Sequence, residues 1–382
     1  MLKLPPEELV ALIRSVFPRF ETDRALAILV DVPREAKRDN PAWKERRGLA
    51  YEWYAALNEA RASIPLERVD LVAYADVGSN NADLPEEAVI LNSPPPDMAA
   101  FLPSKGRATT FGRIFAASQL FLAPTEFSTT APLKVAAKSH GFRAATMPGF
   151  AATMIPALRI DYGEVARRVE ALQTRLSQAD HADISFTVDG KSDCDVHFDL
   201  RRRAAHASSG RFPEAGTAGN LPSGEAYIVP YEGEAGEESR TEGTLPVEID
   251  GEVVWFAIHA NRAVAAHGEG PQAEAERAHL AVEPAYGNMA ELGFGVLADF
   301  GLEPIGEILL DEKLGLHIAF GRSEHFGGAV GPKDFSSPAA VIHLDRIYIP
   351  QAQPRIAVNA VVLGYADGRS ETIMSGGAYA IF

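Results

Sequence analysis

The spacing of apolar residues changes near Ala182, and this change limits the folds that the chain can adopt. Before it, three short runs are largely apolar, at residues 25–31, 69–75 and 119–123. Such runs are typical of strands buried on both faces of a parallel sheet. A helix is expected at residues 164–176, where apolar residues recur at helical spacing. The first part of the chain therefore predicts an α/β domain with a largely parallel sheet and crossover helices.

After Ala182 the pattern is that of antiparallel strands. Residues 183–189 and 194–200 alternate between polar and apolar side chains, and a turn at Gly190 joins them. Short strands between glycine, proline and asparagine turns continue to the C-terminus, with one helix expected after Asn288. This part of the chain predicts a β-rich, α+β domain.

The composition agrees with two globular domains and narrows the class of partners. The chain has 382 residues, of which 46% are hydrophobic, so we place an N-terminal α/β domain at residues 1–182 and a C-terminal β-rich domain at residues 183–382. A formal net charge of -16 would repel a phosphate backbone, so neither nucleic acid nor an anionic membrane is expected as a partner. Cys194 is the only cysteine, which excludes an internal disulfide framework and any metal site built from cysteines. The N-terminal sequence has no signal-peptide pattern, and no stretch approaches the roughly 20 apolar residues of a membrane span, so we expect a cytoplasmic protein.

Carboxylates and imidazoles are concentrated in the last third of the chain, where they suggest a metal site. The segment that contains His343 and Asp345 has the pattern of a strand, and alternation would then project both side chains to the same face. Glu312 and His317 are five residues apart, a spacing that shares a face on neither a helix nor a strand, so a turn at Gly315 is needed to bring them together. Since cysteine is excluded, any metal must be held by histidines and carboxylates.

Each candidate ligand has a simpler explanation when it is taken alone. An acidic residue beside a glycine or proline turn is usually solvated, and a histidine in an apolar strand is usually a core residue with satisfied hydrogen bonds. The six candidates are Glu225, Glu291, Glu312, His317, His343 and Asp345. The case for them depends on the motifs in which they occur together.

Five short motifs follow one another in order. They are Gly-Asn-Leu-Pro-Ser-Gly-Glu at 219–225, Ala-Glu-Leu-Gly-Phe-Gly at 290–295, Asp-Glu-Lys at 311–313, His-Ile-Ala-Phe-Gly at 317–321 and His-Leu-Asp at 343–345. With two further segments at 127–132 and 144–149, the chain resembles the aminopeptidase T family of metallopeptidases, the thermophilic or leucyl aminopeptidases of that type. The resemblance implies that the six candidates hold a pair of divalent ions, zinc or cobalt. It also implies an N-terminal α/β domain, a C-terminal β-rich metal domain and a homodimer.

Two positions depart from the pattern of that family. Seven residues after His317, where the peptidases have a catalytic tyrosine, this chain has Glu324, followed by His325. The first motif has Gly224 before Glu225, where the peptidases have paired acids. We therefore expect the metal ligands to be kept, and Glu324 or His325 to replace the tyrosine in proton transfer.

Three functions are compatible with these residues. The leading hypothesis is an aminopeptidase-like hydrolase that cleaves N-terminal peptide bonds of a peptide or other small substrate through a metal-activated water. The second is a ring-cleaving dioxygenase with one iron(II), because the motifs are also similar to the 2,5-dihydroxypyridine dioxygenases, and His317, His343 and Asp345 offer two imidazoles and one carboxylate. The missing tyrosine favours the dioxygenase, whereas the three further carboxylates favour two metals. The third is a catalytically altered homologue that binds a peptide or a partner protein.

Overall fold

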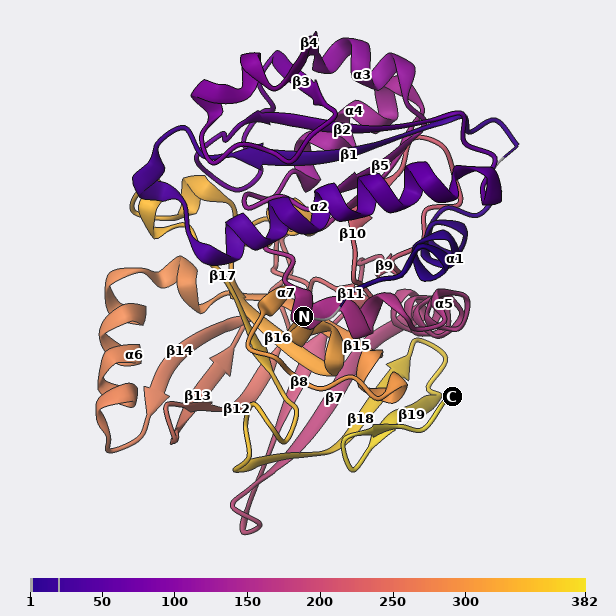
Figure 1. Ribbon diagram of the computed structural model, residues 1–382. Helices are drawn as coiled ribbons and strands as arrows, with labels where there is room; N and C mark the ends of the chain where they lie inside the picture. Colours follow the sequence, from indigo (N-terminus) through magenta and orange to yellow (C-terminus); the bar gives the residue numbers. More distant parts are fainter. Residues whose placement is uncertain (1–2, 20) are drawn as a thin grey trace. The chain divides into compact units, whose positions relative to one another are not determined.

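The computed structural model describes residues 3–19 and 21–382, which form two compact units (Figure 1). The first unit contains the described residues up to Ala166 together with Ser208–Ser223, and the second contains Arg167–Ala207 and Gly224–Phe382. One unit is built on a mostly parallel sheet and the other on antiparallel sheets. The predicted fold class, an α/β part and a β-rich part, is therefore confirmed.

A seven-stranded sheet forms the centre of the first unit, in the order β10-β6-β5-β1-β2-β3-β4. Its strands are β1 (Ala25–Val32), β2 (Arg68–Ala75), β3 (Glu87–Leu91), β4 (Gly106–Thr110), β5 (Leu120–Ala123), β6 (Arg143–Thr146) and β10 (Ala218–Asn220). The pairings from β10 to β2 are parallel, whereas β3 pairs antiparallel with both β2 and β4. All eight residues of β1 are buried, as expected for a strand covered on both faces. The three apolar runs of the sequence thus correspond to β1, β2 and β5.

Helices cover both faces of this sheet. They are α1 (Pro6–Val16), α2 (Pro41–Ala60), α3 (Phe111–Ala117) and α4 (Thr130–His140). The helix α2 runs along one side of the strands, and α3 and α4 lie on the other side (Figure 1). Phe111 of α3 and Leu133 of α4 belong to one hydrophobic cluster with Phe121 of β5. Helices on both faces explain why the central strands have no polar face.

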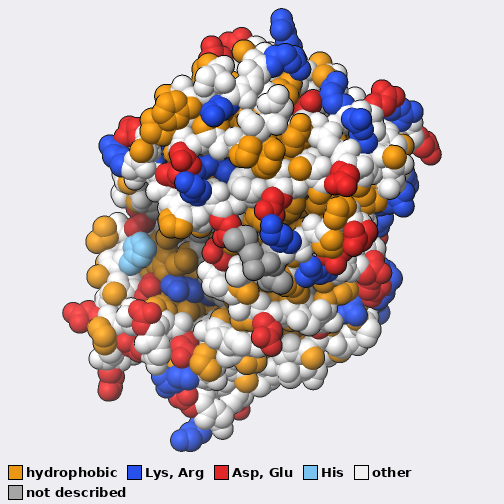
Figure 2. Space-filling view, in the orientation of Figure 1, with side chains coloured by type: hydrophobic (Ala, Val, Ile, Leu, Met, Phe, Trp, Pro, Cys, Tyr) orange, Lys and Arg blue, Asp and Glu red, His pale blue; other side chains and the backbone are white. Residues whose placement is uncertain are grey.

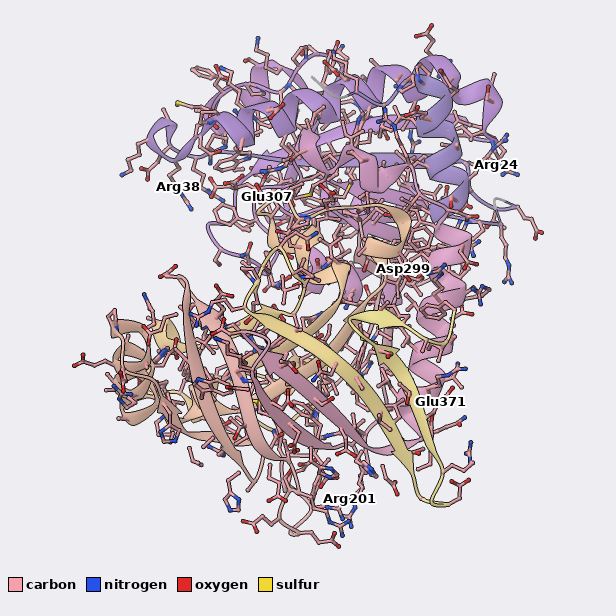
Figure 3. The ribbon with its side chains drawn as sticks, turned by 90° about the horizontal axis from the view of Figure 1, so that it is seen from below. Arg24, Arg38, Arg201, Asp299, Glu307 and Glu371 are labelled. Carbon is pink, nitrogen blue, oxygen red and sulfur yellow. The ribbon has the colours of Figure 1, made fainter. Side chains whose placement is uncertain are left out.

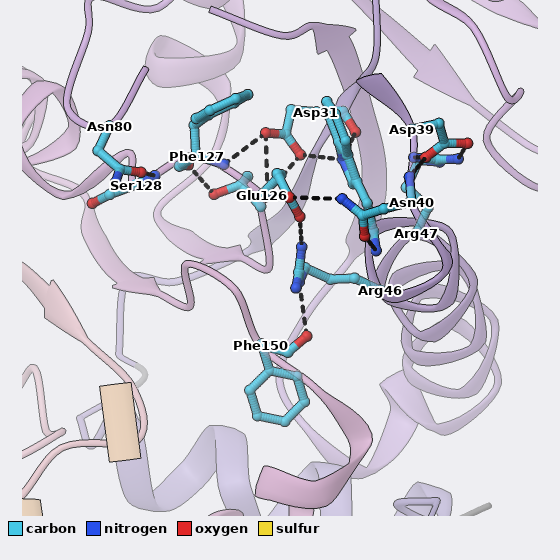
Figure 4. Close-up of polar contacts among 12 residues, drawn as sticks. Asp31, Asp39, Asn40, Arg46, Arg47, Asn80, Glu126, Phe127, Ser128 and Phe150 are labelled. Atoms are coloured by element: carbon cyan, nitrogen blue, oxygen red, sulfur yellow. Dashed lines mark hydrogen bonds and ion pairs between the residues drawn. The ribbon is translucent and has the colours of Figure 1, made fainter. Parts of the chain in front are cut away.

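Asp31, near the end of β1, anchors the segment that follows β5 (Figure 4). Its carboxylate accepts hydrogen bonds from the backbone N–H groups of Glu126 and Phe127 and from the indole N–H of Trp43. Burial raises the pKa of Asp31 to about 6, although these donors act in the opposite direction. The guanidinium of Arg46 in turn donates a hydrogen bond to the side chain of Glu126. A buried carboxylate is thus held mainly by N–H groups.

An eight-stranded antiparallel sheet, here called sheet B, dominates the second unit. Its order is β14-β13-β12-β8-β7-β18-β19-β20. The strands are β7 (Ala179–Val188), β8 (Ser192–Asp199), β12 (Glu242–Ile249), β13 (Glu252–His259), β14 (Arg262–His267), β18 (Ile356–Tyr365), β19 (Ser370–Ser375) and β20 (Ala378–Tyr379). The predicted helix is α5 (Tyr162–Gln178), whose Arg175 Nε donates a hydrogen bond of 2.9 Å to Oε1 of Glu371 on β19 (Figure 3). The predicted hairpin around Gly190 is β7 and β8, and both predictions are confirmed.

A second sheet of five strands, here called sheet C, has the order β17-β16-β15-β11-β9. Its strands are β9 (His206–Ser208), β11 (Glu225–Ile228), β15 (Met289–Gly295), β16 (Leu316–Gly321) and β17 (His343–Ile347). The helix predicted after Asn288 is wrong, because that segment is β15; the helix α6 spans Pro271–Val282 instead, and a short helix α7 spans Ile308–Asp311. All seven residues of β15 are buried, and a short run buried on both faces has no period that separates a strand from a helix.

Acidic and basic side chains are interspersed over the face of the molecule seen in Figure 2. Within residues 3–19 and 21–382, none of the helices combines the length and the apolar character that crossing a membrane requires.

Candidate metal centre

Four neighbouring strands of sheet C carry five of the six candidate ligands. Glu225 begins β11, Glu291 lies in β15, His317 in β16, and His343 and Asp345 in β17. Because side chains alternate along a strand, the two β17 residues share a face, as the sequence predicts. The register continues this face across the sheet, since Asp345 pairs with Ala319 of β16, and Ala319 pairs with Glu291. Strands distant in sequence thus present their ligands to one region.

Glycine and alanine lie opposite every one of these ligands. The cross-strand pairs are Glu225 with Gly295, His317 with Gly293, His343 with Gly321, and Ala319 with both Glu291 and Asp345. A Cβ added to Gly293 would lie 2.0 Å from Nε2 of His317, so the imidazole occupies the space that a side chain would fill. The small residues of the sequence motifs therefore clear room for ligand side chains above the sheet.

Glu225, Glu291 and His317 form the first group of ligand atoms, and all three residues are buried. Nε2 of His317 lies 3.5 Å from Oε2 of Glu225 and 3.5 Å from Oε1 of Glu291. The other ring nitrogen, Nδ1, is 3.2 Å from the carbonyl oxygen of Gly315, which directs Nε2 toward the two carboxylates.

Glu291, His343 and Asp345 form the second group. Nε2 of His343 lies 3.1 Å from Oε2 of Glu291 and 3.6 Å from Oδ1 of Asp345. Its Nδ1 is 2.7 Å from the carbonyl oxygen of Arg322, so this ring is also oriented by a backbone acceptor. Glu291 therefore belongs to both groups, with one carboxylate oxygen directed to each histidine.

The donor set fits a divalent cation. Oε2 of Glu225 is buried and has no hydrogen-bond partner among the described residues, which is costly for a carboxylate oxygen unless another charge satisfies it. Burial raises the pKa of Glu225. For Glu291, burial acts in the same direction, but the contacts with His317 and His343 outweigh it and hold its pKa below the usual range. Oxygen and imidazole donors that converge in this way are the ligand types of zinc, cobalt and iron(II).

Glu312 joins the cluster through Lys313, in the 3₁₀ helix η7 (Glu312–Leu314). Nζ of Lys313 donates hydrogen bonds to Glu312 and, at 2.6 Å, to Oε1 of Glu225. Burial would lower the pKa of Lys313, but the charges of Glu225 and Glu312 outweigh it and raise the pKa. Burial, reinforced by Asp345 and Glu225, raises the pKa of Glu312 to about 7 against the effect of Lys313. The turn predicted at Gly315 is made by α7 and η7 before it, and Gly315 itself is extended.

Glu324 and His325 lie in the 3₁₀ helix η8 (Glu324–Phe326) in different surroundings. The guanidinium of Arg322 donates two hydrogen bonds to the Glu324 carboxylate, from Nε to Oε2 at 2.7 Å and from Nη2 to Oε1 at 3.1 Å. These hydrogen bonds lower the pKa of Glu324. The His325 ring packs edge-on against His343, with centroids 5.2 Å apart. Burial, followed by the charge of His343, lowers the pKa of His325 to about 4. His325 is therefore the neutral base beside the ligands, whereas Glu324 is occupied by Arg322.

The sequence interpretation gave no role to Lys313 or to Tyr227. Tyr227 lies two residues after Glu225 in β11 and so on the same face, a signal that strand periodicity could have supplied. Its ring stacks on His206, with centroids 5.2 Å apart, and contacts Phe326 at 4.8 Å. Burial, then the charges of Glu291 and Glu225, raise the pKa of its phenol, which is therefore a hydrogen-bond donor next to the carboxylates.

Two solved structures share the fold of this chain. No protein-family model matches the sequence, and no curated protein matches it either. Among solved structures, the 2,5-dihydroxypyridine dioxygenase from Pseudomonas putida KT2440 aligns over 99% of each chain with 15% identity and a TM-score of 0.59. Wild-type AmpT from Thermus thermophilus aligns over 98% of each chain with 15% identity and a TM-score of 0.54. The resemblance inferred from the motifs is thus confirmed at the level of the fold, and sheet C carries groups of side chains suited to a divalent metal.

Proposed function

We propose that this chain is a metal-dependent hydrolase that cleaves N-terminal peptide bonds. The observation that carries the proposal is the position of Glu291 in both ligand groups, one with Glu225 and His317, the other with His343 and Asp345. A carboxylate shared between two such groups is suited to bridging two ions. When bound, a pair of zinc or cobalt ions would supply an acidified water and polarise the scissile carbonyl.

The charges of the cluster suit an aminoacyl substrate. Four carboxylates, those of Glu225, Glu291, Glu312 and Asp345, are close to one ammonium and two imidazoles. An excess of negative charge in a site of low dielectric constant attracts both divalent ions and the ammonium group of a peptide N-terminus.

His325 is the chain's own group for proton transfer in this proposal. Its ring lies against His343, and its neighbour Glu324 is held by Arg322. We expect His325→Gln to lower turnover by about 10²- to 10⁴-fold, the range of a general acid or base, while Glu324→Gln retains most of the activity. If Glu324→Gln instead lowers turnover more than His325→Gln does, Glu324 is the group that transfers the proton.

A ring-cleaving dioxygenase is the second candidate, because the chain shares its fold with one and has Glu324 where the peptidases have tyrosine. An iron(II) of that kind would take His317, His343 and Asp345. In the part of the chain that the structure describes, these three do not form one group of converging ligand atoms, and each converges with Glu291 instead. This geometry favours the hydrolase.

Metal analysis of anaerobically purified protein, followed by an assay with leucine p-nitroanilide and added zinc or cobalt, tests the proposal. We expect the centre in sheet C to hold two ions per chain and the protein to release p-nitroaniline, and Glu291→Gln should lose these two ions and the activity. Glu274→Gln, an exposed position on α6, is the matched control and should lose neither. One iron per chain with oxygen consumption on 2,5-dihydroxypyridine would establish the dioxygenase instead, and bound metal without turnover on either substrate would indicate a binding protein. The proposal includes a homodimer, which light scattering would detect.

A further inference from the structure

Three further ligand-type side chains meet on the exposed face of sheet B. His181 and Asp183 lie two residues apart on β7, and His197 of β8 pairs directly with Asp183. Nδ1 of His197 is 2.7 Å from Oδ1 of Asp183, and Nε2 of His181 is 3.4 Å from Oδ2 of the same carboxylate. The two imidazole rings are 4.9 Å apart between centroids. This cluster is built on different strands from the centre in sheet C.

Solvent reaches all three side chains. Their exposed fractions are 36% for His181, 52% for Asp183 and 32% for His197. The neighbouring strands add acidic residues to the same region, since Glu242 of β12 pairs with His197, and Asp195 lies two residues before His197 on β8. Arg240, which lines the same pocket as His197 and Glu242, adds one positive charge to this region.

Gly364 shapes this cluster in the way that Gly293 shapes the centre in sheet C. Gly364 of β18 pairs with His181 of β7. A Cβ added to Gly364 would lie 2.1 Å from Cε1 and 2.2 Å from Nε2 of the His181 ring. The imidazole therefore lies over the glycine of β18, and this position depends on the absence of a side chain at 364.

We propose that His181, Asp183 and His197 form a second, solvent-accessible site for a divalent transition-metal ion of the zinc class. One ligand atom from each residue lies within 4.8 Å of the others. Zinc bonds of about 2.0–2.2 Å to nitrogen and oxygen require only small side-chain movements from these positions. Two imidazoles select such an ion over calcium or magnesium, which prefer oxygen ligands. Three protein ligands leave a fourth coordination position open to water or to an external ligand.

This second site is independent of the proposed hydrolase activity. A zinc titration of full-length protein from which a chelator has removed all metal tests whether the site binds zinc. We expect Asp183→Asn to bind one ion fewer per chain than the wild type, and His267→Gln to bind the wild-type number. His267 is the matched control, because it is an exposed histidine at the end of β14 in the same sheet and does not line the pocket that contains His197. Gly364→Ala keeps all three ligands but displaces the His181 ring, and should weaken this site by about 10- to 100-fold. Equal ion numbers in the wild type and Asp183→Asn would overturn the proposal.

A second measurement locates the ion. In Glu291→Gln protein labelled with ¹⁵N-histidine, in which the centre in sheet C no longer competes for the ion, substoichiometric Cu²⁺ should broaden the ring signals of His181 and His197, and a further Asp183→Asn change should abolish this broadening. Broadening that is equal for His267 would show unselective surface binding and would also overturn the proposal. Because this measurement is made without an intact centre in sheet C, failure of that centre and failure of this site give different results. Circular dichroism confirms that each variant is folded.

Discussion

The cluster in sheet C and the cluster in sheet B use the same side chains in opposite surroundings. Both combine imidazoles with carboxylates, and both place a histidine over a glycine of the neighbouring strand, His317 over Gly293 and His181 over Gly364. In sheet C the carboxylates of Glu225 and Glu291 are buried. In sheet B the Asp183 carboxylate is half exposed. The two clusters differ in the free-energy cost of keeping a carboxylate charged. Water stabilises the exposed carboxylate, whereas only other protein charges stabilise the buried ones.

Lys313 is the clearest consequence of that difference. A buried ammonium bound to two carboxylates lies within the sheet C cluster, whereas the side chains of the sheet B cluster are open to solvent. The comparison shows that the same ligand geometry needs a built-in cation when it is buried. The first and last predictions below change residues of the two sheets, and the second tests the effect of burial on a carboxylate outside both.

The largest effect is expected when the buried cation is removed. Lys313→Met leaves Glu225 and Glu312 without their shared partner and should lower the free energy of unfolding by about 3–5 kcal/mol, as measured by urea denaturation of metal-free protein. Arg369→Met, which removes one member of an exposed pair with Asp367 in sheet B, is the control and should have a much smaller effect. Similar stability losses in the two variants would show that burial does not distinguish these ion pairs.

Asp31 isolates the effect of burial, because N–H donors rather than a bound ammonium surround its carboxylate. Its folded-state pKa of about 6 lies above the ordinary value of 3.8, so this group stabilises the fold most below about pH 4, and the contribution is lost as the pH rises to about 6. A shift of about two pKa units corresponds to about 3 kcal/mol. The stability of the wild type minus that of Asp31→Asn, measured in urea between pH 4 and 7, should fall by this order. A pH-independent difference would contradict the assignment.

The two glycines give the smallest and most direct test. Gly293→Ala forces a methyl group into the buried His317 ring and should cost about 1–3 kcal/mol, because the ring has no free space to enter. Gly364→Ala meets a partly exposed ring that can turn toward solvent, so its unfolding free energy should change by less than about 0.5 kcal/mol. Thermal unfolding of the metal-free variants compares them. A larger loss of unfolding free energy in Gly364→Ala than in Gly293→Ala would contradict the difference in burial between the two histidine rings.

Local patterns in the sequence account for much of the fold. The strands β1, β2 and β5 are buried on both faces, so their sequences are largely apolar runs. The strand β7 is buried on one face, so its sequence alternates between apolar and polar residues. The strand β15 could not be distinguished from a helix, because both of its faces are buried and no periodicity remains.

Some features of the two clusters could not be predicted from the sequence, because they depend on contacts with segments that are distant in the chain. Lys313 bonds to Glu225, which lies 88 residues away, and no local spacing records that contact. The pair formed by Asp183 and His197 could have been found, because the two residues are equally far from the turn at Gly190 and a hairpin then places them opposite each other. His181 could have been added in the same way, because it lies two residues before Asp183 on β7 and therefore on the same face. Only its position over Gly364 depends on the pairing of β7 with β18, whose residues are far apart in the chain.

The ammonium of Lys313 also bears on the order in which this protein is assembled. A chain whose buried acids are already partly balanced by its own cation can complete its fold during synthesis, before it meets any metal. Binding of a divalent metal then becomes a separate, later event, and the polypeptide can be folded before any ion reaches it.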